Sequence, residues 1–146
     1  AASAYLPVDG EGIPTGAVEP VEGTAFDFLL ARPVGQGGQA RYDHNFCLSA
    51  ARGPLRQAAW AQGAASGVEM EVWTTEPGLQ LFTGHFPDRQ VPGLGGVSYR
   101  SFAGFCLEPQ VWPDSPNRPY FPQAVLRPGE EYRQASEFRF RLPQQA

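Results

Sequence analysis

Hydrophobic and polar residues alternate along two stretches of the chain with the period of two that is typical of β-strands. The clearer stretch, residues 68–75, reads Val-Glu-Met-Glu-Val-Trp-Thr-Thr, so its valines and methionine share one face and its glutamates the other. The second stretch, residues 137–142, reads Glu-Phe-Arg-Phe-Arg-Leu and separates apolar from charged residues in the same way. Both patterns predict antiparallel strands with one face against a core and one in solvent.

Weaker apolar segments lie between turn signals, and we interpret them as further strands. These segments are residues 16–21, 43–48, 55–61 and 102–110, of which only 55–61 could form a helical turn instead. The Glu-Pro-Gly sequence at 76–78 is a turn signal, and the extended pattern resumes at 79–83. Residues 68–83 therefore predict a hairpin or a bent strand.

A proline-rich segment from Pro109 to Pro122 carries five prolines. Because proline lacks a backbone N–H, this segment cannot donate a full ladder of hydrogen bonds to a sheet. It also contains Trp112, Tyr120 and Phe121. We therefore expect an ordered excursion that packs through these aromatic side chains and either walls a site or closes the sandwich that such strands form.

The composition favours an all-β chain with one domain, or part of one. The 146 residues are 42% hydrophobic and only 18% charged, which is typical of a folded chain with a sizeable core. They include 17 Gly and 15 Pro, residues that interrupt helices and suit short strands joined by turns.

Charge and cysteine usage exclude several classes of function. The net charge of −4 comes from 15 acidic residues scattered among 11 basic ones, which argues against a nucleic-acid partner. The chain has no apolar run of about 18 residues, the length that spans a membrane, and no signal-peptide pattern. We therefore expect a soluble, cytoplasmic chain, with the periplasm or export as alternatives.

Cys47 and Cys106 allow at most one disulfide. With His44 and His85 they lack metal-site spacing, so we predict no metal.

Glu108 is the best candidate for acid or base chemistry. In the predicted strand its side chain shares a face with Cys106 and Gln110. A carboxylate on a rigid strand is costly to bury unless a partner or a substrate satisfies it, and that cost can raise its pKa toward the range that a general base needs. The alternative is a solvated glutamate on an edge strand, and spacing alone does not decide between the two.

A second group of polar residues crowds the sequence Arg-Tyr-Asp-His-Asn-Phe at 41–46. Asp43, His44 and Asn45 offer the hydrogen-bonding groups that bind sugar hydroxyls, and aromatic faces stack on the C–H surfaces of sugars. The alternative is a strand start at which Asp43 and Asn45 cap local backbone groups. His85 follows a turn, where a single histidine is more often a surface hydrogen-bonding residue than a proton carrier.

Several motifs, in order along the chain, resemble those of the aldose 1-epimerase (galactose mutarotase) family. The resemblance covers about Tyr5 to about Phe140 and corresponds to the C-terminal half of that family. The segments that carry it are Tyr-Leu-Pro-Val-Asp at 5–9 with Ile-Pro-Thr-Gly at 13–16, Tyr-Asp-His-Asn-Phe at 42–46, Thr-Thr-Glu-Pro-Gly-Leu-Gln-Leu-Phe-Thr-Gly at 74–84, Phe-Cys-Leu-Glu-Pro-Gln at 105–110 with Pro-Asp-Ser-Pro-Asn at 113–117, and Leu-Arg-Pro-Gly-Glu at 126–130.

The resemblance implies an antiparallel β-sandwich of the galactose mutarotase type, of which residues 1–146 form the C-terminal portion, with the sugar on one concave sheet. It implies Glu108 as the general base and Asp43, His44, Gln80 and Phe82 as substrate-binding residues, without a cofactor. In the family mechanism a glutamate takes the proton of the anomeric hydroxyl while a histidine protonates the ring oxygen, so that the ring opens and recloses as either anomer. That acid histidine belongs to the half that precedes Tyr5.

A half sandwich exposes apolar faces, so we expect a partner fragment that supplies the missing N-terminal half, or self-association. The ligand implied is a monosaccharide. One alternative function is a non-catalytic sugar-binding β-module that retains Asp43 and the aromatic residues. Another is an enzyme acting on hexose phosphates, which would require an arginine cluster at the site, and Arg100 and Arg118 are the nearest candidates.

Overall fold

Eight strands in two antiparallel sheets form the described part of this computed structural model, which comprises residues 2–36, 41–86 and 91–142. The elements are β1 (Ala4–Tyr5), β2 (Glu19–Pro20), β3 (Asp43–Cys47), β4 (Arg56–Gln62), β5 (Glu69–Thr74), β6 (Gly78–Phe82), β7 (Cys106–Gln110) and β8 (Ser136–Arg141), with the short 3₁₀ turns η2 (Leu94–Gly96) and η3 (Ser115–Asn117). No α-helix occurs in these described ranges. None of their residues forms a helix that is long and apolar enough to cross a membrane.

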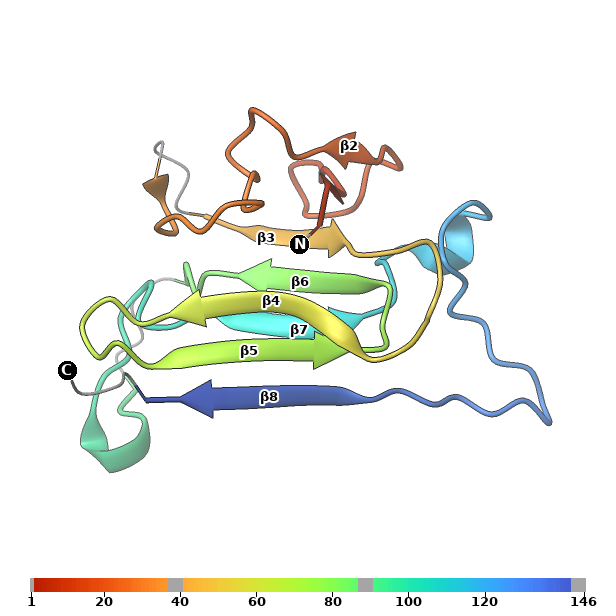
Figure 1. The fold of residues 1–146 in the computed structure, drawn as a ribbon. Helices are drawn as coiled ribbons and strands as arrows, with labels where there is room; N and C mark the ends of the chain where they lie inside the picture. The colour runs from red at the N-terminus through yellow and green to blue at the C-terminus, as the bar shows by residue number, and fades with distance from the viewer. Residues whose placement is uncertain (1, 37–40, 87–90, 143–146) are drawn as a thin grey trace.

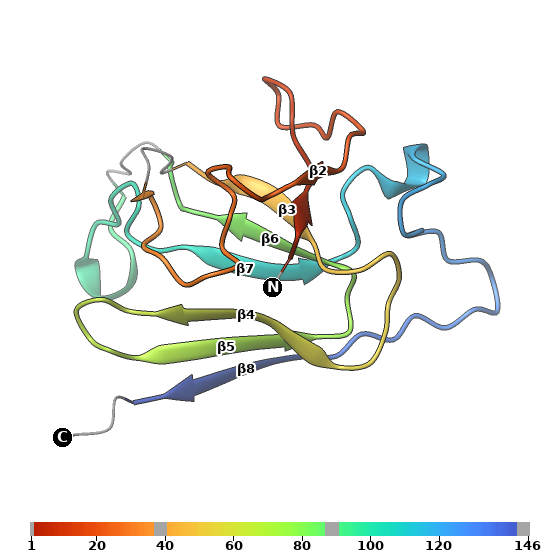
Figure 2. The same ribbon diagram turned by 45° about the horizontal axis from the view of Figure 1, so that its top comes forward.

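The larger sheet has the strand order β2-β1-β3-β6-β7, and the smaller sheet has the order β4-β5-β8. We call them the first and the second sheet. They stack as two layers, with β8 at the outer margin of the second sheet, as Figure 1 and Figure 2 show. The predicted antiparallel all-β sandwich is therefore confirmed.

The two strongest alternating patterns form neighbouring strands of the second sheet. Residues 69–74 form β5 and residues 136–141 form β8, and the two pair in register from Glu69 with Arg141 to Thr74 with Ser136. Val72 packs toward the first sheet in a cluster with Leu79 and Ala58, as expected for the apolar face of the pattern. Residues 55–61 lie almost entirely in β4 and form a strand rather than a helical turn.

The predicted connection between β5 and β6 is partly wrong. The chain does bend at residues 75–77, but β5 pairs with β4 and β8 while β6 pairs with β3 and β7, so the two strands lie in different sheets. The bend therefore carries the chain from one layer to the other. At its centre Glu76 is fully buried, and it accepts hydrogen bonds from Arg52 Nε at 2.8 Å and from the Tyr132 hydroxyl at 2.9 Å.

Two other predicted strands are shorter than expected. Within residues 16–21 only Glu19–Pro20 is a strand, and within residues 102–110 the strand begins at Cys106. Phe102 has a positive φ of 62°, a backbone conformation that is incompatible with a regular strand. The aromatic residues before Cys106 therefore made the predicted strand begin too early.

The proline-rich segment packs as predicted. Trp112 and Phe121 are buried in a cluster with Leu6 and Cys47, and their rings meet edge to face with centroids 5.1 Å apart. The Trp112 Nε1–H donates to the carbonyl of Pro77 at 2.9 Å, which ties the segment to the bend between the layers. Tyr120 remains exposed.

The space between the sheets is open on one side. An apolar cavity of about 680 Å³ lies there, and its walls include Phe46, Leu81 and Leu107 from the first sheet and Ala59 from the second. Phe138 and Phe140, on the same face of β8 as the core positions of β5, are 47% and 65% exposed. The described residues thus leave a substantial apolar surface uncovered.

Candidate functional site

The candidate site lies on the face of the first sheet that points away from the second. Phe46, Leu79 and Leu81 pack in the core clusters on the inner side, so alternate positions of the same strands point outward. The register of β3, β6 and β7 then places outward side chains in three rows across the strands. These rows are Asp43, Phe82 and Cys106; Asn45, Gln80 and Glu108; and Cys47, Gly78 and Gln110. We call this surface the polar face.

Hydrogen bonds join the amides and one carboxylate of the polar face into a chain. Gln80 Nε2 donates to Asp43 Oδ1 at 2.7 Å. Gln110 Nε2 donates to Gln80 Oε1 at 3.2 Å and approaches Asn45 Oδ1 at 3.4 Å. Side chains from three neighbouring strands are therefore connected across the face.

Glu108 stands directly opposite Gln80 on β7, which is the edge strand of the first sheet. Its side chain is exposed, which matches the alternative of a solvated glutamate on an edge strand rather than that of a buried carboxylate. The physical reason is the edge position, because no described residue forms a strand beyond β7. Cys106 precedes it on the same face, and burial, with a smaller contribution from Glu108, raises the pKa of the Cys106 thiol.

The buried side chain of Trp112 forms a wall at one end of the polar face. Trp112 packs over Gly78, where an added Cβ would lie 3.0 Å from Trp112 Cδ1 and 2.4 Å from Asn45 Oδ1. No side chain other than hydrogen fits at this position without displacing its neighbours. Asn45, beside this wall, is only 2% exposed.

Aromatic rings form the other end of the polar face. The Phe82 ring lies 5.0 Å from the His85 ring and 4.8 Å from the Phe86 ring, measured between centroids. His85 Nδ1 lies 3.5 Å from Thr83 Oγ1. The face therefore grades from buried amides beside Trp112, through exposed carboxylates, to aromatic surface.

The structure separates His44 from the other predicted site residues. Asp43, Gln80, Phe82 and Glu108 share the polar face, but His44 points to the opposite side of β3. There its ring meets Phe26 edge to face, with centroids 4.7 Å apart. Burial lowers the pKa of His44, an effect that the nearby Asp43 carboxylate partly offsets.

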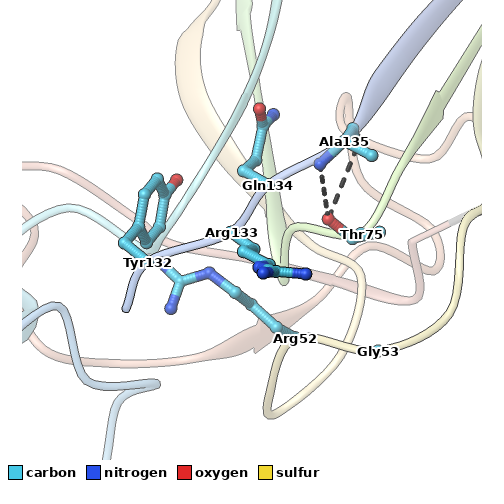
Figure 3. A pocket seen from close by; sticks show the side chains of 7 residues that line it. All are labelled: Arg52, Gly53, Thr75, Tyr132, Arg133, Gln134 and Ala135. Carbon is cyan, nitrogen blue, oxygen red and sulfur yellow. Dashed lines mark hydrogen bonds between the residues drawn. The ribbon is translucent and has the colours of Figure 1, made fainter. Parts of the chain in front are cut away.

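A hollow of about 640 Å³ lies at the bend between the layers, away from the polar face (Figure 3). Its lining includes Arg52, Tyr132 and Arg133, together with Thr75 and Ala135, which hydrogen bonds join to each other. Glu108 lines neither this hollow nor the apolar cavity between the sheets.

Other predicted chemistry does not assemble in the described residues. Arg118 pairs with Asp114 at 2.8 Å and donates to the carbonyl of Pro14, so its guanidinium is committed elsewhere. The cysteines Cys47 and Cys106 are both free, and burial raises the pKa of Cys47 to about 12. Across residues 2–36, 41–86 and 91–142, no group of three or more His, Cys, Asp or Glu side chains could hold a metal ion.

The sequence pattern gives Gln110 no role and leaves Asn45 between two alternatives, a sugar ligand and a cap of local backbone groups. The alternation in 105–110 did predict that Gln110 shares a face with Glu108. Its contacts with Gln80 and Asn45 depend on the register of three strands, which the sequence pattern does not specify.

The fold and the polar face together define a class of protein: an antiparallel β-sandwich that presents carboxylates, amides and aromatic rings on one sheet, the groups that bind neutral polyhydroxyl ligands. A family model described as Aldose 1-epimerase matches residues 1–139. The chain therefore belongs to the aldose 1-epimerase family.

Known proteins support this membership. The chain is 49% identical over 146 residues to the galactose mutarotase of Mus musculus, covering 96% of this chain and 42% of that protein. It is 38% identical over 149 residues to the aldose 1-epimerase of Escherichia coli strain K12, covering 95% and 43% respectively. A crystal structure of the GalM/aldose epimerase homologue from C. elegans superposes with a TM-score of 0.86 at 27% identity, over 97% of this chain and 44% of that one. The chain thus spans less than half the length of these relatives.

Proposed function

We propose that the protein containing this chain is an aldose 1-epimerase that interconverts the α and β anomers of free hexoses such as galactose and glucose. In this proposal Glu108 is the general base, and Asp43, Gln80 and Phe82 bind the sugar. One observation carries the proposal: all four side chains project from the same face of three adjacent strands. Two carboxylates, an amide and an aromatic ring there match the hydroxyls and C–H surface of a pyranose.

The proposed reaction moves one proton at each of two oxygens. Glu108 takes the proton of the anomeric hydroxyl, the C1–O1 bond becomes a carbonyl, and the bond between C1 and the ring oxygen breaks as an acid protonates that oxygen. Rotation about C1–C2 and reclosure, with the roles of base and acid reversed, yield the other anomer. The exposed position of Glu108 gives a sugar direct access to the base.

We propose that the acid is a histidine in the N-terminal half of the protein, the half that precedes Tyr5 in members of the family. Neither histidine of the described residues suits the role. His44 lies on the inner side of β3, and His85 packs its ring against Phe82 at the aromatic end of the face. Residues from the preceding half would cover the open polar face and exclude water from it, which strengthens hydrogen bonds to the sugar.

The uncovered apolar surface supports the part of this proposal that concerns the N-terminal half of the protein. The cavity between the sheets is apolar, and Phe138 and Phe140 of β8 are exposed on the face that carries the core positions of β5. Such surface is normally covered by further polypeptide of the same protein or by a second copy. We propose the preceding half of the sandwich as its cover, with self-association as the alternative when that half is missing.

The alternative functions have less support. A non-catalytic sugar-binding module would use the same face and differs only in the absence of turnover. An enzyme for hexose phosphates would need a cationic site, but Arg118 is held by Asp114. No salt bridge within the described residues brings an arginine to Asp43 or Glu108.

The deciding experiment follows the anomer exchange of galactose and glucose by polarimetry with the complete protein that contains this chain. We expect exchange well above the buffer rate, and a loss of about 100- to 10,000-fold in kcat for Glu108→Gln, the usual contribution of a general base. The matched control is Glu71→Gln on the second sheet, which should retain full activity. If the complete protein binds sugar without accelerating exchange, the binding module is the correct function; if Glu108→Gln keeps the normal rate, Glu108 is not the base.

A further inference from the structure

The hydrogen-bonded amides of the polar face point in one direction. Asp43 ends the chain, and an ionised carboxylate can only accept hydrogen bonds. Gln80 must therefore turn its Nε2 group toward Asp43, which leaves its Oε1 facing Gln110. That oxygen requires a donor, and Gln110 Nε2 supplies it at 3.2 Å.

The opposite end of the chain lies in a dry environment. Gln110 Nε2 also approaches Asn45 Oδ1, and Asn45 is 2% exposed beside the wall formed by Trp112 and Gly78. Water has little access to Asn45, so the amide groups there depend on one another for hydrogen bonds. A reversed orientation of Gln110 would place its oxygen against two other oxygens, those of Gln80 and Asn45.

We propose that Gln110, supported by Asn45, is a positioning residue that fixes the amide orientation of Gln80 and, through Gln80, the carboxylate of Asp43. This inference rests on the proposed function, because Asp43 and Gln80 are the proposed sugar ligands. With Gln80 oriented in this way, one oxygen of Asp43 is held by the protein and the other is presented to the ligand together with the second Nε2 hydrogen of Gln80. Gln110, two residues after Glu108 on β7, thus sets the pattern of donors and acceptors that the polar face offers to the sugar.

Substitutions at Gln110 test this role. Gln110→Met keeps the length of the side chain but removes the donor. It should raise KM for galactose about 5- to 20-fold, the value of one lost hydrogen bond to a charge-linked amide, and change kcat by less than about threefold. Gln110→Glu also places an acceptor against Gln80 Oε1, so its KM at pH 7.5 should rise at least as much.

Acidification separates positioning from a general structural role. At pH 5.5 a growing fraction of the glutamate in Gln110→Glu carries a proton, which can be donated to Gln80 Oε1 as the native amide does. Its KM should therefore fall several-fold toward the native value, whereas KM of Gln110→Met should not recover. Asp43 and Glu108 are the carboxylates that share this face, and both are present in every variant, so the comparison with Gln110→Met corrects for them.

Controls make the result decisive. Gln57→Glu adds the same charge at an exposed position of β4 and should leave KM unchanged. If Gln110→Glu does not fold, the side-chain NMR signals of the Gln80 amide provide a second measurement. These signals should move in Gln110→Met relative to the native protein. A native KM in Gln110→Met, or no recovery of Gln110→Glu at low pH, overturns the inference. Because Glu108→Gln tests turnover independently, a failure of the Gln110 variants to change KM leaves the proposed function standing.

Discussion

The two sheets each present a polar outer face, but the charges on those faces are satisfied in different ways. On the second sheet Glu71 accepts from Trp73 Nε1 at 2.9 Å and pairs with Arg141 at 3.2 Å. Arg139 pairs with Glu137 at 2.6 Å and lies 4.2 Å above the Trp73 ring. Every carboxylate in this set has a cation or an indole donor within the same sheet.

On the first sheet, the carboxylates of the polar face have amides and a thiol as neighbours instead of cations. Asp43 is contacted by Gln80, and Glu108 lies beside Gln80 and Cys106. Within the described residues neither carboxylate joins a salt bridge. A face whose charges neutralise one another is stable in water and needs no ligand, whereas carboxylates without a cation remain available to donors from a ligand.

Among the substitutions that compare the two faces, the largest effect is expected for Asp43. Asp43→Ala removes the acceptor at the end of the amide chain and a proposed ligand of the sugar, so kcat/KM for galactose should fall by about 100-fold, or about 2.7 kcal/mol. Glu137→Ala removes a carboxylate from the second sheet, where exposed ion pairs contribute little, and should change kcat/KM by less than about twofold. Steady-state polarimetry on the complete protein provides both values. Equal losses in the two variants would mean that the faces do not differ in function.

A substitution of Glu76 tests how much the bend between the two sheets contributes to stability, and it involves neither outer face. Its carboxylate is fully buried and holds Arg52 and the Tyr132 hydroxyl at the bend. Glu76→Gln weakens the charged hydrogen bond to Arg52, so the free energy of unfolding should fall by about 1.5–3 kcal/mol. Urea unfolding measures this change.

The matched control for Glu76 is Glu131→Gln. The ion pair of Glu131 with Arg133 is exposed at both ends, with side chains 68% and 82% accessible, and its loss should be barely measurable. Indistinguishable unfolding curves for the two variants would show that the buried carboxylate does not stabilise the crossing between the layers.

The strands and their exposed faces could be predicted from the sequence, because period-two alternation is a local property. The layer in which each strand lies could not, since the turn signal at 76–78 is the same whether the chain returns along the same sheet or, as the bend at 75–77 does, crosses to the other. For the same reason the burial of Glu76 was not foreseen. Its partners Arg52 and Tyr132 are distant in sequence and meet it only through the crossing.

The candidate site shows both the value and the limit of motifs. The Asp-His-Asn-Phe motif treats Asp43 and His44 as one unit, but adjacent residues of a strand point to opposite faces, and the structure separates them accordingly. Alternation within each strand also brings Asp43, Gln80 and Glu108 to one side once the register is known. The amide chain through Gln110 depends on that register and could not be predicted from a single sequence.

His44 offers a pH test of the inner side of the first sheet. Burial lowers its pKa below the ordinary value of about 6.5, so the unfolded chain binds a proton more readily than the folded one as the pH falls through that value. Stability should therefore decrease from pH 7.5 to pH 5.5. His44→Phe should reduce this decrease, by less than the effect of Glu76→Gln, and should leave KM for galactose unchanged. A raised KM with unaltered pH dependence would instead place His44 among the sugar ligands.

The smallest expected effect is a change in the reactivity of Cys106. Its exposed thiol lies on the polar face beside Glu108, whereas the thiol of Cys47 is buried with a pKa of about 12 and forms almost no thiolate. Iodoacetamide should therefore modify Cys106 and spare Cys47, as peptide mass spectrometry can establish. Galactose at about three times its Kd should slow the modification about fourfold, because only the unoccupied fraction of the protein reacts.

Sorbitol, which cannot close to a pyranose, should give no protection at the same concentration. In Asp43→Ala, galactose at the concentration used for the native protein should also fail to protect, because the weakened binding leaves the face unoccupied. Protection that persists in this variant would mean that galactose covers Cys106 without using Asp43. The polar face would then bind sugar through Gln80, Phe82 and Glu108 without Asp43. The absence of salt bridges at the two carboxylates would then no longer support the first sheet as the proposed sugar-binding surface.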